Sequence, residues 1–208
     1  TTAGAFAAAN SLTMTTSGNA VSSAAAIAVI VQGAVLSVSM AMGATDKFTT
    51  RVSTAVTTFS FTTQSDVASG GTITITLPAN YFSAKASPAG VLVPASGGTA
   101  TLTATCTMTV GTLTIVCTTA TAVLAAGAHK ITFAAGELTT AGAFAAATSL
   151  TMTTSGNAQS AAAAIEVIVQ GAVSSVSMLM APEDQFTTRI TTAVTTFSFT
   201  TQSDVPSG

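Results

Sequence analysis

The chain has 208 residues, a net charge of −2 and only 6 % charged side chains, whereas charged residues make up roughly a quarter of an ordinary soluble domain. The absence of a basic surface argues against nucleic acid as a partner. The 42 threonines and 22 serines place hydroxyl groups where most proteins display charges. So neutral a surface favours either a coat of O-linked sugar or assembly into a fibre.

The first residues of the chain begin an internal repeat. The sequence TTAGAFAAA at residues 1–9 returns at 139–147, and an offset of 138 aligns residues 1–70 with 139–208, identical at 57 of 70 positions. The differences cluster in residues 41–51, as expected of a surface loop between two strands. The sequence therefore predicts a tandem head-to-tail repeat of 138 residues, a unit long enough to bury its own core.

The repeat boundaries are expected near residues 32–33 and 170–171, where the sequence shows no Pro- or Ser-rich linker. The predicted units are the C-terminal part of one repeat at 1–34, a complete β-sandwich repeat at 35–172 and the N-terminal part of the next repeat at 173–208. Such short connections predict closely abutting domains and a stiff rod. We interpret the chain as an excerpt of a longer protein.

The uncharged residues 20–45 are apolar enough to suggest a membrane span. Their copy at 158–182 carries Glu166 in place of Ala28, and a carboxylate inside a bilayer is costly. The segment also alternates with a period of two. We therefore expect buried strands here and no transmembrane segment.

Short segments with apolar residues at every second position, most of them with Thr or Ser in between, predict half-buried strands. In chain order they are residues 37–42, 57–63, 72–77, 101–110, 113–117, 129–133, 150–153 and 165–170. Turn residues separate them at 69–71, 96–98, 125–128 and 155–157. This spacing predicts an all-β fold, an antiparallel β-sandwich. The Ala-rich residues 141–147 leave a helical turn open by propensity.

The best-patterned strands form a predicted hairpin around a two-residue turn at Gly111 and Thr112, which fits type II′. Its register places three apolar pairs on one face: Val110 with Leu113, Met108 with Ile115, and Cys106 with Cys117.

Cys106 and Cys117 are therefore predicted to form a cross-strand disulfide, which implies an oxidising compartment. Their spacing is not C-x-x-C and the chain has one histidine, so redox and zinc sites are disfavoured. A two-residue turn puts the pair at a hydrogen-bonded position, with Cα atoms about 5.5 Å apart. Two buried free thiols are the alternative.

No residue pattern predicts catalysis, a metal site or a cofactor, and we expect the protein not to be an enzyme. His129 is the only histidine, no serine lies in a nucleophile context, and no calcium-loop spacing occurs. Asp46 and Arg51 recur as Asp184 and Arg189. We interpret Asp46 and Arg51 as a surface or interface ion pair.

Alternate threonines on two predicted strands share one face, which is the candidate O-glycan or interface face. They are Thr72, Thr74, Thr76, Thr101, Thr103, Thr105, Thr107 and Thr109. Three interpretations stay open: ordinary β-propensity on a solvated sheet, a platform for glycans, or a regular hydroxyl array that orders water or binds ice.

Three segments carry a family resemblance: TTFSFTTQSD (57–66), GTITITLPANYF (71–82) and KITFAAGELTTAG (130–142). In strand rhythm and composition the chain resembles the immunoglobulin-like repeats of giant extracellular proteins. These include cell-surface and fibre-forming repeat proteins of microalgae and other protists and, more loosely, bacterial repeat adhesins. The resemblance implies an Ig-like sandwich, secretion and a structural role. It departs from antibody-type domains because the chain lacks Trp and its cysteines form a hairpin pair, so no binding residues carry over.

Together these features predict an extracellular structural repeat protein that forms or decorates a cell-surface filament. We expect O-linked glycans on Thr or Ser, no other cofactor, and self-association into a fibre or contact with neighbouring repeats. An adhesin stalk made of spacer domains is the alternative, and an ice-binding Thr-rich surface is a minor one.

Overall fold

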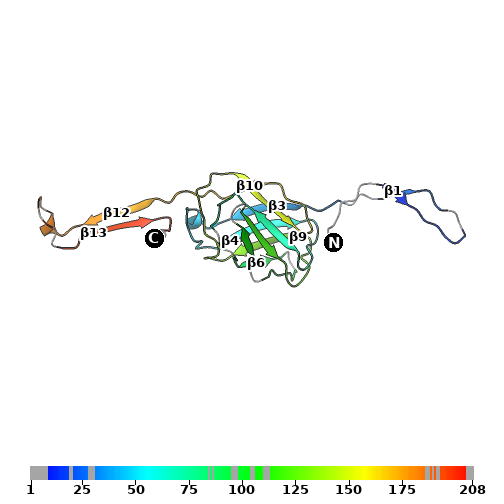
Figure 1. Cartoon of the computed structure of the whole chain (residues 1–208), viewed down its shortest axis with the longest axis horizontal. Coiled ribbons are helices and arrows are strands. Elements are labelled where there is room, and N and C mark those ends of the chain that lie inside the picture. Colours follow the sequence, from blue (N-terminus) through cyan, green and yellow to red (C-terminus); the bar gives the residue numbers. More distant parts are fainter. Residues whose placement is uncertain are drawn as a thin grey trace.

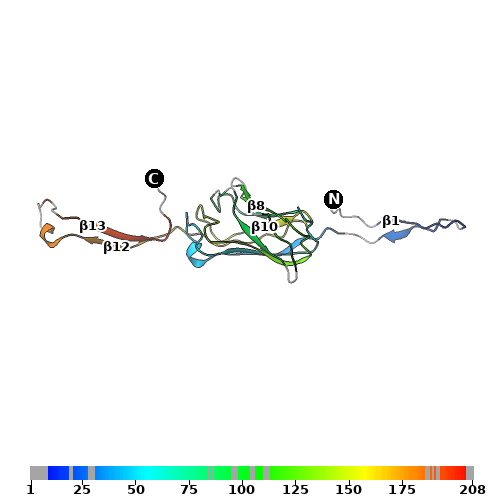
Figure 2. The same cartoon turned by 90° about the horizontal axis from the view of Figure 1, so that it is seen from below.

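The computed structural model describes residues 9–18, 21–27, 31–83, 85, 87–94, 98–103, 106–109, 113–185, 188, 190 and 193–204. Within them the regular structure is β-strand, apart from two 3-10 helices at Ala44–Asp46 and Pro182–Asp184. A central body carries one hairpin arm on each side (Figure 1), and a view turned by 90° shows the same arrangement (Figure 2). The predicted all-β fold with antiparallel sheets is confirmed. No described segment is a helix with the length and apolar character of a membrane span.

One sheet of the central body has four strands in the order β3-β4-β9-β6. The strands are β3 (Val35–Ala41), β4 (Thr57–Thr63), β6 (Gly90–Val93) and β9 (Gly127–Phe133). Strict alternation along β4 buries Phe59 and Phe61 and leaves Ser60 between them half-buried. This sheet therefore has one apolar face, as its period-two sequence predicts.

The second sheet has five strands in the order β11-β10-β5-β8-β7. The strands are β5 (Thr72–Thr76), β7 (Thr107–Thr109), β8 (Thr114–Thr118), β10 (Thr148–Thr154) and β11 (Ala163–Ala164). Here too the apolar residues are buried, among them Ile73, Ile75 and Ile115, while the threonines between them are not.

The buried faces of the two sheets enclose one hydrophobic core, as in a β-sandwich. Its residues extend along the chain from Val35 to Ile168. Loop residues complete it: Tyr81 is fully buried, and its ring lies 4.9 Å from that of Phe82 and 5.1 Å from that of Phe144. The Tyr81 hydroxyl donates to the backbone oxygen of Glu166 at 2.6 Å, which satisfies its one buried polar group.

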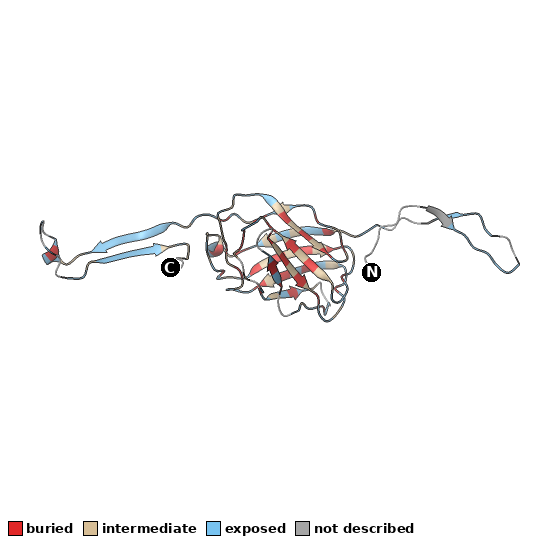
Figure 3. Ribbon diagram, in the orientation of Figure 1, coloured by how far each residue is buried: buried red, intermediate tan, exposed pale blue. Residues whose placement is uncertain are grey.

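The two arms are hairpins that pair within themselves. One consists of β1 (Ala9–Leu12) and β2 (Ala25–Ile27), the other of β12 (Val173–Leu179) and β13 (Thr196–Thr201). The β12–β13 arm repeats the register of β3–β4, including one irregularity at the same place. Whereas β4 is largely buried, β12 and β13 are almost entirely exposed (Figure 3).

Two expectations for individual elements are wrong, and one alternative that the sequence left open is settled. Residues 165–170 do not form an alternating strand: Ile165 and Ile168 are buried and Val167 and Val169 are exposed, because Ile168 exchanges two backbone hydrogen bonds with Phe144. Residues 141–147 form no helical turn. Strand 101–110 is interrupted, since only Thr107–Thr109 and an isolated bridge between Leu102 and Thr119 are paired within its described part. Strand β6 was not anticipated.

Candidate functional site

The predicted disulfide between Cys106 and Cys117 is confirmed. Met108 pairs with Ile115, as the predicted hairpin register requires, while the turn and the pair of Val110 with Leu113 lie outside the described residues. The expected hydrogen-bonded spacing is wrong, because the two Cα atoms are 4.3 Å apart. The Cys106 N–H donates to the Pro88 oxygen at 2.9 Å instead of joining the ladder with β8.

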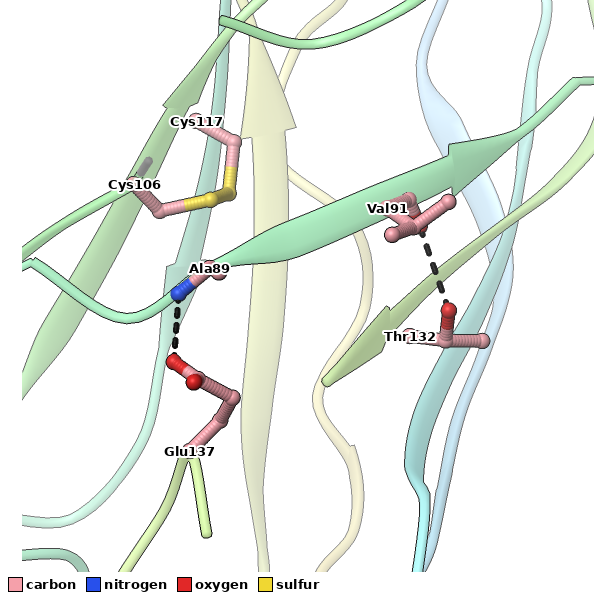
Figure 4. Close-up of a disulfide and its surroundings, with 6 residues drawn as sticks. All are labelled: Ala89, Val91, Cys106, Cys117, Thr132 and Glu137. Carbon is pink, nitrogen blue, oxygen red and sulfur yellow. Dashed lines mark hydrogen bonds between the residues drawn. A yellow bond between two sulfur atoms is a disulfide. The ribbon is translucent and has the colours of Figure 1, made fainter. Parts of the chain in front are cut away.

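The disulfide lies against the start of β6 (Figure 4). A Cβ added at Gly90 would lie 2.9 Å from the Cys106 Sγ and 3.2 Å from a ring carbon of Phe133. The backbone N–H of the preceding residue, Ala89, donates to the Glu137 carboxylate at 2.6 Å. Both sulfurs are buried, so the bond is structural: it fixes β6 beside the hairpin.

The threonines predicted to share one face do point away from the core. Thr72, Thr74 and Thr76 lie on β5 between buried isoleucines, and Thr107 and Thr109 flank buried Met108. Thr101 and Thr103 are also exposed. Thr105 lies outside the described residues.

The same outer face includes threonines that the prediction left out. We use the name threonine face for Thr72, Thr74, Thr76, Thr107, Thr109, Thr114, Thr118, Thr151 and Thr153. Strand pairing aligns them in rows, of which the most regular contains Thr151, Thr76, Thr114 and Thr109 on four adjacent strands. The alternation of Thr with apolar residues in 113–117 and 150–153 already carried this signal; what was lacking was the strand order.

The expected ion pair between Asp46 and Arg51 is wrong. Asp46 is fully buried, and its carboxylate accepts hydrogen bonds from the Thr54 N–H and hydroxyl, both at 2.7 Å, and from the Ala55 N–H at 2.9 Å. Burial alone would raise the pKa of Asp46, but these hydrogen bonds and, as a smaller contribution, the nearby charge of Arg51 lower it below its ordinary value. The Asp46 side chain therefore holds together the two ends of its own loop, at residues 46 and 54–55.

Arg51 pairs instead with Asp204, which belongs to the next predicted repeat. The Arg51 Nη1 lies 2.9 Å from Asp204 Oδ1, and the Val52 N–H donates to Asp204 Oδ2 at 2.9 Å. Thr140 holds the loop from the other side, since its hydroxyl accepts from the Arg51 N–H at 2.9 Å. This contact between a loop of the central body and the β12–β13 arm is the junction.

A second ion pair lies beside the junction. Lys47 Nζ is 2.7 Å from Glu166 Oε2, and the backbones of Lys47 and Thr49 both bond to Val169 at 2.9–3.0 Å. Glu166 is thus the partner of Lys47. The aligned positions are Ala28 in residues 1–34 and Gln185 in residues 173–208, so each of the two aligned copies carries one of the two charges.

His129 is buried and serves the core. Its Nε2 lies 3.1 Å from the Thr63 hydroxyl, and its ring packs 5.4 Å from that of Phe61. Burial lowers its pKa, although a backbone hydrogen bond at Ala125 opposes the shift. The described residues contain no cluster of three or more potential metal ligands.

Comparison with known proteins assigns the chain to no family: no protein-family model, curated protein or solved structure matches it.

Proposed function

We propose that this chain is part of an extracellular structural repeat protein. In this proposal Ig-like sandwiches, each corresponding to residues 35–172, follow one another head to tail and form or decorate a filament on the cell surface. It involves no catalytic activity. The observation that carries it is the junction, where Arg51 and Val52 of one repeat bond to Asp204 of the next without an intervening linker.

Two further features support an extracellular filament. A buried disulfide is typical of proteins that fold in an oxidising compartment. The threonine face offers rows of hydroxyl groups on an almost uncharged surface, which suits O-linked glycans or packing against a neighbouring repeat.

Electron microscopy of native material tests the proposal. Long regular filaments that contain this chain are expected, whereas isolated rods with a terminal knob would favour an adhesin stalk. Mass spectrometry of the same material tests the glycans, because a mass equal to that of the bare polypeptide would exclude them.

The aligned rows of the threonine face also favour a second candidate, a surface that orders water or binds ice. Thermal hysteresis of the purified chain at high concentration tests it, with Thr74→Lys and Thr76→Lys as variants that interrupt two adjacent rows. Hysteresis that these variants leave unchanged would rule out this face.

A further inference from the structure

We propose that residues 49–52 and residues 202–204 form a charge-paired clasp that sets the angle between successive repeats. The partner of the loop at 49–52 is the next repeat of this chain. The inference rests on the proposed tandem arrangement, and it names the surface through which neighbouring repeats are oriented.

The two oxygens of the Asp204 carboxylate bind different parts of the loop. Oδ1 accepts from the Arg51 guanidinium and Oδ2 from the Val52 backbone N–H, each at 2.9 Å. If the carboxylate were bonded to the flexible Arg51 side chain alone, both groups could move together and their orientation would not be fixed. The bond to a backbone N–H ties the carboxylate to the main chain of the central body, so the contact fixes orientation as well as proximity.

Two hydroxyl contacts widen the clasp beyond a single ion pair. The Thr50 hydroxyl donates to the Asp204 backbone oxygen at 3.1 Å, and the hydroxyls of Thr49 and Ser203 lie 3.3 Å apart. Thr50 adopts a φ of 53°, which is unusual for a β-branched residue, and its copy Thr188 has a φ of 64°. Thr50 and Thr188 therefore share the same uncommon backbone conformation.

The turn that presents Asp204 is already shaped by its own repeat. Gly171 N–H donates to the Ser203 hydroxyl at 3.1 Å, and Ala172 N–H donates to the Gln202 amide oxygen at 2.9 Å. A Cβ on Gly171 would lie 2.2 Å from the Ser203 hydroxyl oxygen. Only glycine permits this approach, so the carboxylate is held ready for the loop.

The same turn exists at residues 64–66 of the first copy. Ala34 N–H donates to the Gln64 amide oxygen at 2.8 Å, and a Cβ on Gly33 would lie 2.3 Å from the Ser65 hydroxyl oxygen. Asp66 accepts from the Ala126 N–H at 2.7 Å, and within the described part of the chain it has no ion pair. Asp66 is therefore a matched control for Asp204: the same residue in the same turn, bonded to the Ala126 N–H instead of an arginine.

Only the orientation of neighbouring repeats is assigned to the clasp. The Arg51 and Asp204 side chains are 26 % and 42 % exposed, and partly exposed ion pairs are weak. Two repeats joined covalently hold each other at an effective concentration in the millimolar range, roughly, so weak contacts suffice to select one angle.

Pulsed dipolar spectroscopy on the full chain tests how well that angle is fixed, because it measures the distribution of distances between two labels. Nitroxide labels are attached at Val91→Cys and Ser198→Cys, which are exposed positions on β6 and β13, with the native disulfide left oxidised. Arg51→Gln and Asp204→Asn are each expected to widen the distance distribution at least two-fold. The exchange variant Arg51→Asp with Asp204→Arg restores the opposite charges but not the Val52 bond, because a guanidinium accepts no hydrogen bond. It is expected to recover only part of that loss, and Asp66→Asn is expected to change nothing.

Salt provides a second readout that needs no change at the clasp. About 1 M salt screens exposed charges, so it is expected to widen the distribution of the labelled parent chain and to leave that of Asp204→Asn unchanged. Equal widths in the parent, Arg51→Gln and Asp204→Asn, or equal widening by Asp66→Asn, would overturn the clasp. If filaments form but the width of the distance distribution does not change with these substitutions, the clasp alone is rejected. If the distribution is narrow and depends on these charges but no filaments form, the proposed function alone is rejected.

Discussion

Phe61 and Phe199 occupy equivalent positions in the two copies, yet Phe61 is 1 % exposed and Phe199 is 61 % exposed. Their hairpins pair in the same register. The difference comes from what covers them: β9 pairs with β4 and the second sheet packs over it, whereas the described partner of β13 is β12. The hairpin therefore has the same strand pairing with and without a core over it.

This contrast predicts that the same substitution at two equivalent sites causes a large loss of stability at one and almost none at the other. Phe59→Ala is expected to lower the free energy of unfolding by about 3–5 kcal/mol, because it leaves a cavity in a closed core. Phe197→Ala, at a ring that is 69 % exposed, is expected to change it by less than about 0.5 kcal/mol. Denaturant unfolding followed by tyrosine fluorescence checks both, since Tyr81 is the only tyrosine and is fully buried. Equal losses would mean that the arm also packs against a core.

Reduction of the Cys106–Cys117 disulfide is expected to destabilise the central body by about 2–3 kcal/mol, because the bond closes a short loop in the unfolded chain. The measurement is the melting temperature with and without reductant. The double variant Cys106→Ala with Cys117→Ala is the control, and its melting temperature should not respond to reductant. A parent chain equally insensitive would contradict the prediction.

Gly90→Ala is expected to cost about 1–3 kcal/mol, because the added methyl group overpacks the space between the disulfide and Phe133. Gly142→Ala is the matched control, since a Cβ there would meet Phe144 at an ordinary 3.7 Å. Its effect is expected to stay within about 0.5 kcal/mol. Denaturant midpoints of both variants decide. In a Cys106→Ala background, where the sulfur is absent, the additional cost of Gly90→Ala should be smaller than in the parent chain.

His129 makes stability depend on pH in mildly acidic solution. Burial lowers its pKa below the ordinary 6.5, so the unfolded state binds the proton more readily than the folded state. The stabilisation is complete above about pH 6.5 and is lost as the pH falls through the folded-state pKa. Asp46, whose pKa is also lowered, contributes stability that is complete above its ordinary pKa of 3.8 and is lost only at lower pH, in a separate range.

The check is the free energy of unfolding between about pH 7.5 and pH 5. It is expected to decline over this range in the parent chain and to decline less in His129→Gln, which keeps a polar partner for Thr63. Parallel slopes for the two proteins would show that another group titrates.

Much of the fold follows from one local rule. Strands β4, β5 and β8 and the pairing of Met108 with Ile115 were predictable because their apolar residues recur at every second position. The rule failed at residues 165–170, where the chain leaves the sheet and buries Ile165 and Ile168 at a spacing of three. It also missed β6, because its short sequence GVLV shows no alternation.

The partners of charged side chains were harder to predict than the strands. Asp46 lies five positions from Arg51 in sequence, whereas Asp204 lies 153 positions away. The nearer carboxylate is occupied by Thr54 and Ala55, and nothing in the local sequence shows this. For a similar reason the threonines of β5 and β7 were predicted to share a face, whereas those of β8 and β10 were not. The strand order that brings these threonines into rows depends on long-range pairing.

The contact between Arg51 and Asp204 joins two different surfaces of the repeat, a loop on one unit and a turn on the following one. Interfaces of this heterologous kind do not close on themselves unless a rotation brings the last unit back to the first. A chain oriented by such contacts has a direction: an arginine is presented at one end and an aspartate at the other. A filament built from it would grow and cap differently at its two ends.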